Sequence, residues 1–447
     1  MNQKKLTQGN VASILIGLTL PIIWGVFAVM SLYLADTYFV AQLGTDDLAA
    51  ISFIFPVAIA VQSVALGLGM GASSVIARAI GVGDRHKVQQ LTTNSLILSL
   101  AIVGVLIIIG QSTIDPLFAA LGASERVLPL IRDYMQIWYP GMIFLVVPVV
   151  GNNAIRAAGN AIVPSLILTI GVVVNIVLDP LFIFGWGGFP SLGIQGAAIA
   201  TVIARATGLP ISLMFLHYRQ QMLLLAVPNW QEVLNCWKSV LHIGLSATAT
   251  QIIAPISVGF MTRLIAGSGS EAVAGFGIAS RIESFPLVFL TALSLSMGPF
   301  VGQNWGAKKF ARVKRALQLS IMFCLVWGTL VAIALGFSGG WIASQFNSHP
   351  DVVAIAAQYL TIVPISYTTL GIVLISSSTF NALGKPLPSL VINLTRMLIL
   401  YVPLAYLGSR VFGVLGIFTA ICFSNLAVGI GAFFWTRNTY QKMLCYK

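Results

Sequence analysis

The sequence predicts an all-α integral membrane protein with twelve transmembrane helices in two six-helix lobes, related by a pseudo-two-fold axis along the membrane normal. Three observations predict this fold class: the composition, the number of long apolar runs and an internal repeat. Hydrophobic residues make up 57% of the 447 residues, charged residues make up only 8%, and the mean hydropathy is +0.93. Soluble domains carry roughly 25% charged residues, so the composition excludes an ordinary soluble protein.

The apolar runs define the elements. A transmembrane helix needs about 20 mostly apolar residues, and the runs lack the alternation of barrel strands. The run after the polar segment Met1–Asn10 exceeds the apolar part of a signal peptide, so we expect the first span to be retained. The glycines of Gly67–Gly71 indicate close helix packing within the second span. The predicted spans are 12–40, 48–77, 91–111, 129–155, 162–185, 194–216, 238–265, 273–302, 316–337, 353–380, 388–409 and 413–436.

An internal repeat predicts the two lobes. Gly44–Ala50 resembles Gly269–Gly275, and Pro164–Leu166 resembles Pro388–Leu390, at a nearly constant offset. Each half would hold six spans, and six is even, so both halves share one membrane orientation, as in parallel transporter repeats. The predicted domains are an N-terminal lobe (1–221), a cytoplasmic linker (222–235) and a C-terminal lobe (236–447).

The distribution of charge predicts the orientation. The chain has 24 Lys and Arg residues against 12 Asp and Glu, a net charge of +12. With the N-terminus inside, most basic residues fall in internal loops, and most acids fall outside. Basic loops mark the cytoplasmic side, so both termini should be cytoplasmic, in the inner membrane of a prokaryote. The positive balance therefore indicates lipid-bilayer topology and not a nucleic-acid partner.

Two acids within apolar spans are the leading site candidates. A charge at mid-membrane costs about 2.5–3.5 kcal/mol on insertion scales, so an ionisable residue there is a candidate for a functional role. Asp36 lies in the first span, with Tyr33 one turn before it as a possible phenol partner; Asp179 shares a face of the fifth span with Asn175. These groups could load and release H⁺, or supply oxygen ligands for Na⁺.

Other polar or kinked positions are weaker candidates. Pro21 lies inside the first span and could serve as a hinge that bends when Asp36 changes protonation; a static kink is the alternative. Arg281 and Glu283 in the eighth span could form an ion pair that lines a cavity. No phosphate-binding loop and no metal-ligand cluster appears in the sequence, so we predict no catalytic residue, no enzyme activity and no cofactor beyond a coupling ion.

Several motifs in combination resemble the multidrug and toxic compound extrusion (MATE) family, over essentially the whole chain. The pattern is most similar to the prokaryotic branch named for a DNA-damage-inducible protein F. The motifs are Leu34-Ala35-Asp36-Thr37, Arg156-Ala157-Ala158-Gly159-Asn160, Asn175-x-x-x-Asp179-Pro180, Gly196-Ala197-Ala198-Ile199-Ala200-Thr201 and Ser280-Arg281-Ile282-Glu283.

The resemblance implies a function and a set of roles. It implies a monomeric antiporter that exports cationic or amphipathic drugs and other organic cations by alternating access, in exchange for H⁺ or Na⁺. Asp36 would be the main coupling carboxylate, Asn175 and Asp179 would complete its network, and Thr201 would be a further member. Pro21 matches the proline at which the first span is proposed to bend in the family.

One departure and two alternatives complete the prediction. Another branch of the family places an acid in the seventh span and a second in the tenth; here Gln251 and Gly371 occupy those neighbourhoods, so coupling should be confined to the N-terminal lobe. Glu283 is the acid that could contradict this. The alternative functions are a lipid-linked oligosaccharide flippase of the same superfamily, and a channel or non-transporting membrane protein.

Overall fold

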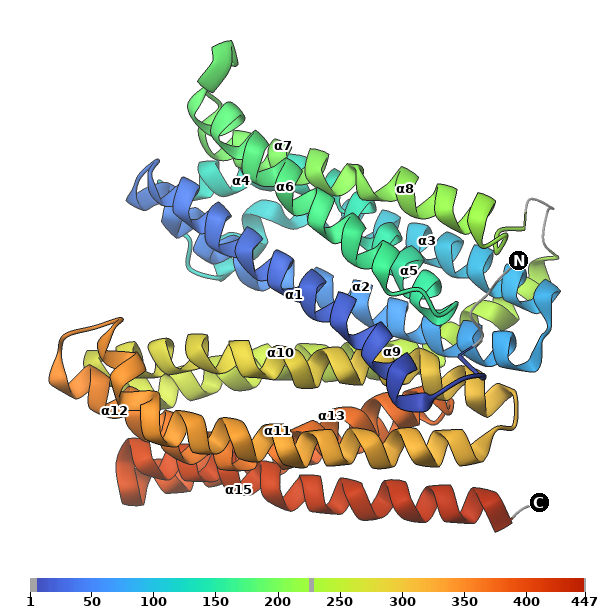
Figure 1. Cartoon of the computed structure of the whole chain (residues 1–447). Helices are drawn as coiled ribbons and strands as arrows, with labels where there is room; N and C mark the ends of the chain where they lie inside the picture. The colour runs from blue at the N-terminus through green and yellow to red at the C-terminus, as the bar shows by residue number, and fades with distance from the viewer. Residues whose placement is uncertain (1–5, 225–228, 446–447) are drawn as a thin grey trace. The chain divides into compact units, whose positions relative to one another are not determined.

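The structure is a computed structural model that describes residues 6–224 and 229–445, and α-helices dominate both ranges (Figure 1). No β-strand occurs within these ranges. Residues 225–228, in the middle of the predicted linker 222–235, lie outside the described residues. The all-helical fold predicted from the apolar runs is therefore confirmed for the described chain.

The chain divides into two compact units. The first is built mainly from Leu20–Thr248, and the second from Thr7–Thr19 together with the chain from Ala249 onward. The first and ninth helices contribute residues to both units. The predicted lobe boundaries at 221 and 236 stay a prediction, because the contact boundary falls inside a helix.

The first unit contains the helices up to the start of α9. They are α1 (Val11–Ala41), α2 (Thr45–Val82), α3 (Arg85–Ala120), α4 (Leu128–Gly141), α5 (Ile143–Ala157), α6 (Ile162–Phe184), the short η1 (Trp186–Gly188), α7 (Gly193–Ala206), α8 (Gly208–Met214) and the π-helical η2 (Phe215–Arg219). Of α1, the residues up to Thr19 belong to the second unit.

The second unit contains the end of α9 and the helices that follow it. They are α9 (Trp230–Ala266), α10 (Ser270–Gly306), α11 (Phe310–Ser344), α12 (Pro350–Ile362), the 3₁₀-helical η3 (Val363–Ser366), α13 (Tyr367–Ala382), α14 (Pro386–Leu394), the π-helical η4 (Thr395–Tyr401) and α15 (Val402–Cys445).

Eleven helical runs among the described residues are long and apolar enough to span a membrane. The last of them, Pro386–Gln441, is interrupted at Gly413, whose φ of 58° and ψ of −136° are not helical. A Cβ at Gly408 would lie 2.5 Å from the carbonyl oxygen of Gly416, so the chain turns back on itself at this point. The last run therefore contains two spans, and the predicted number of twelve holds.

Several predicted spans consist of two helices, and proline explains one break directly. The predicted span 129–155 is α4 followed by α5, and Pro140 lies at the end of α4. Proline has no N–H to donate to the carbonyl four residues earlier. That carbonyl, of Gln136, accepts a hydrogen bond from Gln111 Nε2 at 3.0 Å instead. A polar side chain of α3 thus satisfies the backbone group that proline leaves free, as buried membrane helices require.

Close packing around α2 follows from its glycines. A Cβ at Gly67 would lie 2.7 Å from the backbone nitrogen of Thr248, and a Cβ at Gly71 would lie 2.5 Å from the carbonyl oxygen of Val240, both on α9. Gly69 similarly faces Asn153 on α5. The prediction that Gly67–Gly71 marks close helix packing is confirmed.

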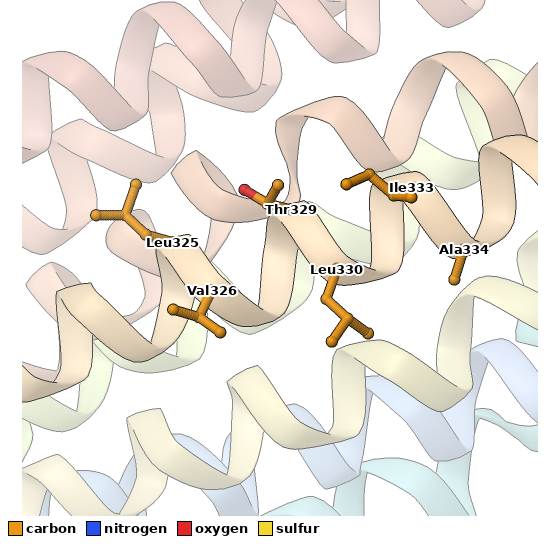
Figure 2. A pocket seen from close by; sticks show the side chains of 6 residues that line it. All are labelled: Leu325, Val326, Thr329, Leu330, Ile333 and Ala334. Carbon is orange, nitrogen blue, oxygen red and sulfur yellow. The ribbon is translucent and has the colours of Figure 1, made fainter.

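Many large apolar side chains point away from the core, as expected for helices that face lipid. Figure 2 shows one such apolar surface on α11, where a hollow is lined by residues of that helix alone. Leu325, Val326, Leu330 and Ile333 are each at least half exposed. The hollow has no charged lining residue, and it is not the site of the buried polar groups described below.

Candidate functional site

The buried polar face of α6 forms the centre of the site. Asn175 and Asp179 lie one helical turn apart, and they are 0% and 1% exposed. α7 packs closely against α6, because a Cβ at Gly196 would press into the backbone at Phe182 and Ile183. This close approach brings Thr201 of α7 against Asn175.

The Asn175 amide links the two acids. Nitrogen and oxygen of an amide are assigned from their hydrogen bonds. In the orientation that satisfies both atoms, Asn175 Nδ2 donates to Asp36 Oδ1 at 2.7 Å and to Asp179 Oδ2 at 3.2 Å. Its Oδ1 then accepts from the backbone nitrogen of Thr201 at 3.3 Å. One amide therefore ties α1, α6 and α7 together.

The two carboxyl groups also lie within hydrogen-bonding reach of each other. Asp36 comes from α1 and is half-buried, whereas Asp179 is buried. A hydrogen bond between two carboxyl groups requires one of them to hold the proton, because an ionised carboxylate only accepts. The pair can therefore exist with one proton and one negative charge, which is the chemistry of a proton-exchange site.

Two further side chains face the pair. Tyr134 of α4 is 8% exposed and its hydroxyl faces the side chain of Thr201. Arg205, one turn after Thr201 on α7, acts on both Asp36 and Tyr134 through its positive charge. Arg205 thus offsets the negative charge of the ionised pair.

Tyr33, expected as the phenol partner of Asp36, is bonded elsewhere. Its hydroxyl donates to Gln62 Oε1 on α2 at 2.8 Å. Spacing along one helix cannot reveal this, because Gln62 lies on a different helix, 29 residues further along the chain. Tyr134 was missed for the same reason. Its one sequence signal is that a tyrosine in a buried span usually needs a partner for its hydroxyl.

Pro21, the predicted hinge, lies inside a continuous helix. α1 runs unbroken from Val11 to Ala41. Pro21 follows directly on the boundary between Thr19 and Leu20, where α1 passes from the second unit to the first. The role of Pro21 as a hinge stays a prediction.

The predicted ion pair between Arg281 and Glu283 does not form. Residues two apart on a helix point in nearly opposite directions. Arg281 is exposed, and Glu283 accepts a short hydrogen bond from the Tyr359 hydroxyl of α12. The ion pairs found in the described ranges are Arg132 with Asp115 and His349 with Asp351.

Comparison with known proteins identifies the family. The sequence profile described as MatE matches the chain twice, over residues 21–181 and 247–407. This chain belongs to the MATE family. The two matches confirm the internal repeat, and the first match includes Asp36, Asn175 and Asp179. MATE proteins are transporters and not enzymes, so the chain is a multi-pass membrane transporter.

Relatives of this MATE transporter have different recorded substrates. The FAD transporter of Shewanella oneidensis is 39% identical over 97% of this chain and 96% of its own length. The multidrug export protein MepA of Staphylococcus aureus is 23% identical over 94% of this chain and 90% of its own length. The crystal structure of the Vibrio cholerae MATE transporter VcmN in the bent form matches with a TM-score of 0.91 and 31% identity, covering 98% of each chain. The fold of twelve helices in two lobes is thus shown.

Proposed function

We propose that this MATE transporter is a proton-driven exporter of amphipathic organic solutes, in which Asp36 and Asp179 form the coupling site. The observation that carries the proposal is the hydrogen-bonded set of Asp36, Asn175 and Asp179. Adding or removing the shared proton changes the charge of the set by one. It also changes which oxygen can accept from Asn175, and this alters how firmly α1 is held to α6. A change in α1 is the step by which proton binding drives alternating access.

The hydrogen-bonded orientation of the Asn175 amide fits H⁺ as the coupling ion. Na⁺ is a hard cation, and hard cations bind several oxygen ligands. In the assigned orientation the NH₂ group of Asn175 faces both carboxyl groups, and its oxygen faces the backbone of Thr201. A cation between Asp36 and Asp179 would meet a donor where it needs an acceptor. Na⁺ binding would require the amide to rotate.

The relatives favour two substrate classes. MepA, recorded as a multidrug exporter, supports cationic or amphipathic drugs, as the resemblance implies. The 39% identity to the FAD transporter supports a flavin nucleotide as the second candidate. FAD carries negative charge on its diphosphate, whereas the drugs are cations, so one pair of probes separates the two classes. We further propose that the chain works as a monomer in the inner membrane with both termini in the cytoplasm.

The first prediction concerns Asp36. In inside-out vesicles with an acidic lumen, we expect the wild type to take up ethidium or FAD, and Asp36→Asn to lower uptake at least about tenfold, because the pair can no longer exchange its proton. Uptake is measured by fluorescence, with and without Na⁺. Asp46→Asn, an exposed acid at the start of α2, is the control that should keep wild-type uptake.

Three outcomes decide this proposal. Wild-type uptake in Asp36→Asn would show that the coupling assignment is wrong. Uptake that requires Na⁺ and ignores the pH gradient would replace H⁺ by Na⁺ at the same site. Uptake of FAD without uptake of ethidium would exclude multidrug export and leave flavin nucleotide export.

A further inference from the structure

The second unit contains a buried polar cluster of its own, around Glu283 of α10. The Tyr359 hydroxyl of α12 donates to Glu283 Oε2 in a short hydrogen bond. Tyr367, the first residue of α13, places its hydroxyl close to the same carboxyl group. Tyr359 and Tyr367 are 4% and 0% exposed. Three helices therefore direct oxygen atoms to one point, at which Glu283 is half-buried and the two tyrosines are buried.

Two atoms at this point lack the partners that buried polar groups normally have. The Tyr367 hydroxyl and Arg396 Nε are both buried, and neither makes a hydrogen bond of acceptable geometry in the described structure. An unsatisfied buried polar atom costs about 1–3 kcal/mol. Such atoms beside a carboxyl group indicate a site whose hydrogen bonds are completed in another state.

Arg396 is held near Glu283 but not against it. Its Nη1 donates to Asn425 Oδ1 of α15 at 3.1 Å, and Asn425 Nδ2 donates to Ser366 Oγ at 3.0 Å. Arg396 and Glu283 act on each other through their charges, yet they form no ion pair within 4.0 Å in the described residues. Arg396 also lies in η4, a π-helical segment, and such segments are frequent at functional sites.

The charged and titratable groups that face Glu283 come from three elements. Tyr359 comes from α12, Tyr367 from α13, and Arg396 and Tyr401 from η4. Of these, Glu283 is the group that can change charge most readily, because the tyrosine hydroxyl and the arginine guanidinium each lose a proton only in strong base.

From this geometry we infer that Glu283 is a second proton-binding site, and that Arg396 exchanges Asn425 for Glu283 when the proton leaves. Protonated Glu283 accepts from Tyr359, while Arg396 stays on Asn425, as in this structure. Loss of the proton to water leaves a carboxylate with one negative charge. Arg396 then moves onto this carboxylate, and the Tyr367 hydroxyl turns to donate to it.

The exchange links proton binding to helix movement in the second unit. While Arg396 is bonded to Asn425, η4 is tied to α15. Once Arg396 has moved to Glu283, η4 is tied to α10. One proton would thus determine which helix the π-helical segment follows. A purely structural role for the cluster predicts the opposite, namely that Glu283 keeps one protonation state at every working pH.

Infrared spectroscopy tests proton binding without any transport assay. In purified Asp36→Asn/Asp179→Asn protein, which lacks the first pair, we expect a carboxylic-acid C=O band to grow as the pH falls from about 9 to about 5. Adding Glu283→Gln should remove this band. Adding Glu271→Gln, which neutralises an exposed acid at the start of the same helix, should leave it unchanged.

A second variant protects this test against misfolding. Tyr359→Phe keeps the carboxyl group but removes its donor, so we expect the C=O band to shift in frequency. An identical band with and without Glu283, or no band that depends on pH, would overturn the inference. An unshifted band in Tyr359→Phe would assign the proton to another residue and would overturn it as well.

Transport provides the functional test and separates this inference from the first proposal. In proteoliposomes with the membrane potential clamped at zero, accumulation of a solute rises about tenfold per pH unit for each coupled proton. With two coupled protons, we expect ethidium accumulation in the wild type to rise about 100-fold per pH unit of gradient. In Glu283→Gln, with one coupled proton, we expect it to rise about tenfold per pH unit. An unchanged dependence would overturn the inference. Failure of the wild type to transport at all would contradict the proposed function, while the infrared result still decides the proton site.

Discussion

At the scale of single residues, the sequence predicts the two acids of the site with Asn175 and Thr201, but not every group that surrounds them. Asp36 and Asp179 stand out because an acid in an apolar span is costly. Asn175 follows from its spacing to Asp179. The aromatic partner could not be predicted, because spacing within α1 indicates Tyr33, whereas packing between helices puts Tyr134 beside Thr201. Contacts between distant segments depend on the fold and not on local spacing.

This difference between the two tyrosines can be tested with a matched pair of variants. Tyr134→Phe removes a hydroxyl that faces the proposed coupling site, and a hydrogen bond is worth about 0.5–1.5 kcal/mol, so we expect transport to slow by about two- to tenfold. Tyr33→Phe removes a hydroxyl bonded to Gln62, and it should leave the pH dependence of transport unchanged. Initial uptake rates in vesicles over a range of pH are the measurement. A pH profile altered by Tyr33→Phe alone would restore the spacing-based interpretation.

At the scale of helices, the apolar runs predicted where spans lie but not where they break. The predicted first span, 12–40, nearly coincides with α1 (Val11–Ala41). The tenth span, predicted as 353–380, consists instead of α12, η3 and α13. Hydropathy averages over about 20 residues, so it cannot resolve a break of a few residues. Pro364 near the start of η3 is the local signal of that break.

The close packing of α2 against α9 can be tested at the glycines of α2. Gly67→Ala places a Cβ 2.7 Å from the Thr248 nitrogen and 2.8 Å from the Gly244 carbonyl oxygen, both of which are backbone atoms. Such overpacking costs about 1–3 kcal/mol, so we expect a lower Tm in detergent. Gly104→Ala on α3 meets nothing within 4 Å and should keep or raise the Tm, because alanine favours helix. Equal Tm values for the two variants would contradict the close packing of α2 against α9.

At the scale of the whole molecule, the composition and the internal repeat predict a membrane protein with two similar halves. The scarcity of charge identified a membrane protein, and the repeat placed one copy of the family sequence in each half of the chain. The substrate could not be predicted in this way. It depends on a small number of side chains, and relatives with the same fold are recorded for FAD and for multiple drugs. A fold does not determine what its site accepts.

The orientation predicted from the basic loops is a property of the whole chain, and fusions to reporters test it. We expect a reporter that is active only in the cytoplasm to be active at either terminus and inactive when inserted after Ser268, between α9 and α10. Basic residues mark the cytoplasmic side, so the loop after α10 should behave like the termini. Activity after Ser268 with inactivity at the termini would invert the topology.

The start of the chain has its partners far along the sequence. Lys309 Nζ donates to the carbonyl oxygen of Thr7 at 2.9 Å, and Arg312 Nη1 donates to that of Gly9 at 2.6 Å, across 302 and 303 residues. At about 5–20 residues per second, the ribosome needs roughly 15–60 s to make this much chain. The first helix therefore enters the membrane early but cannot make these contacts until the start of α11 has been synthesised. Assembly of the second unit thus depends on residues that were synthesised at the very start of the chain.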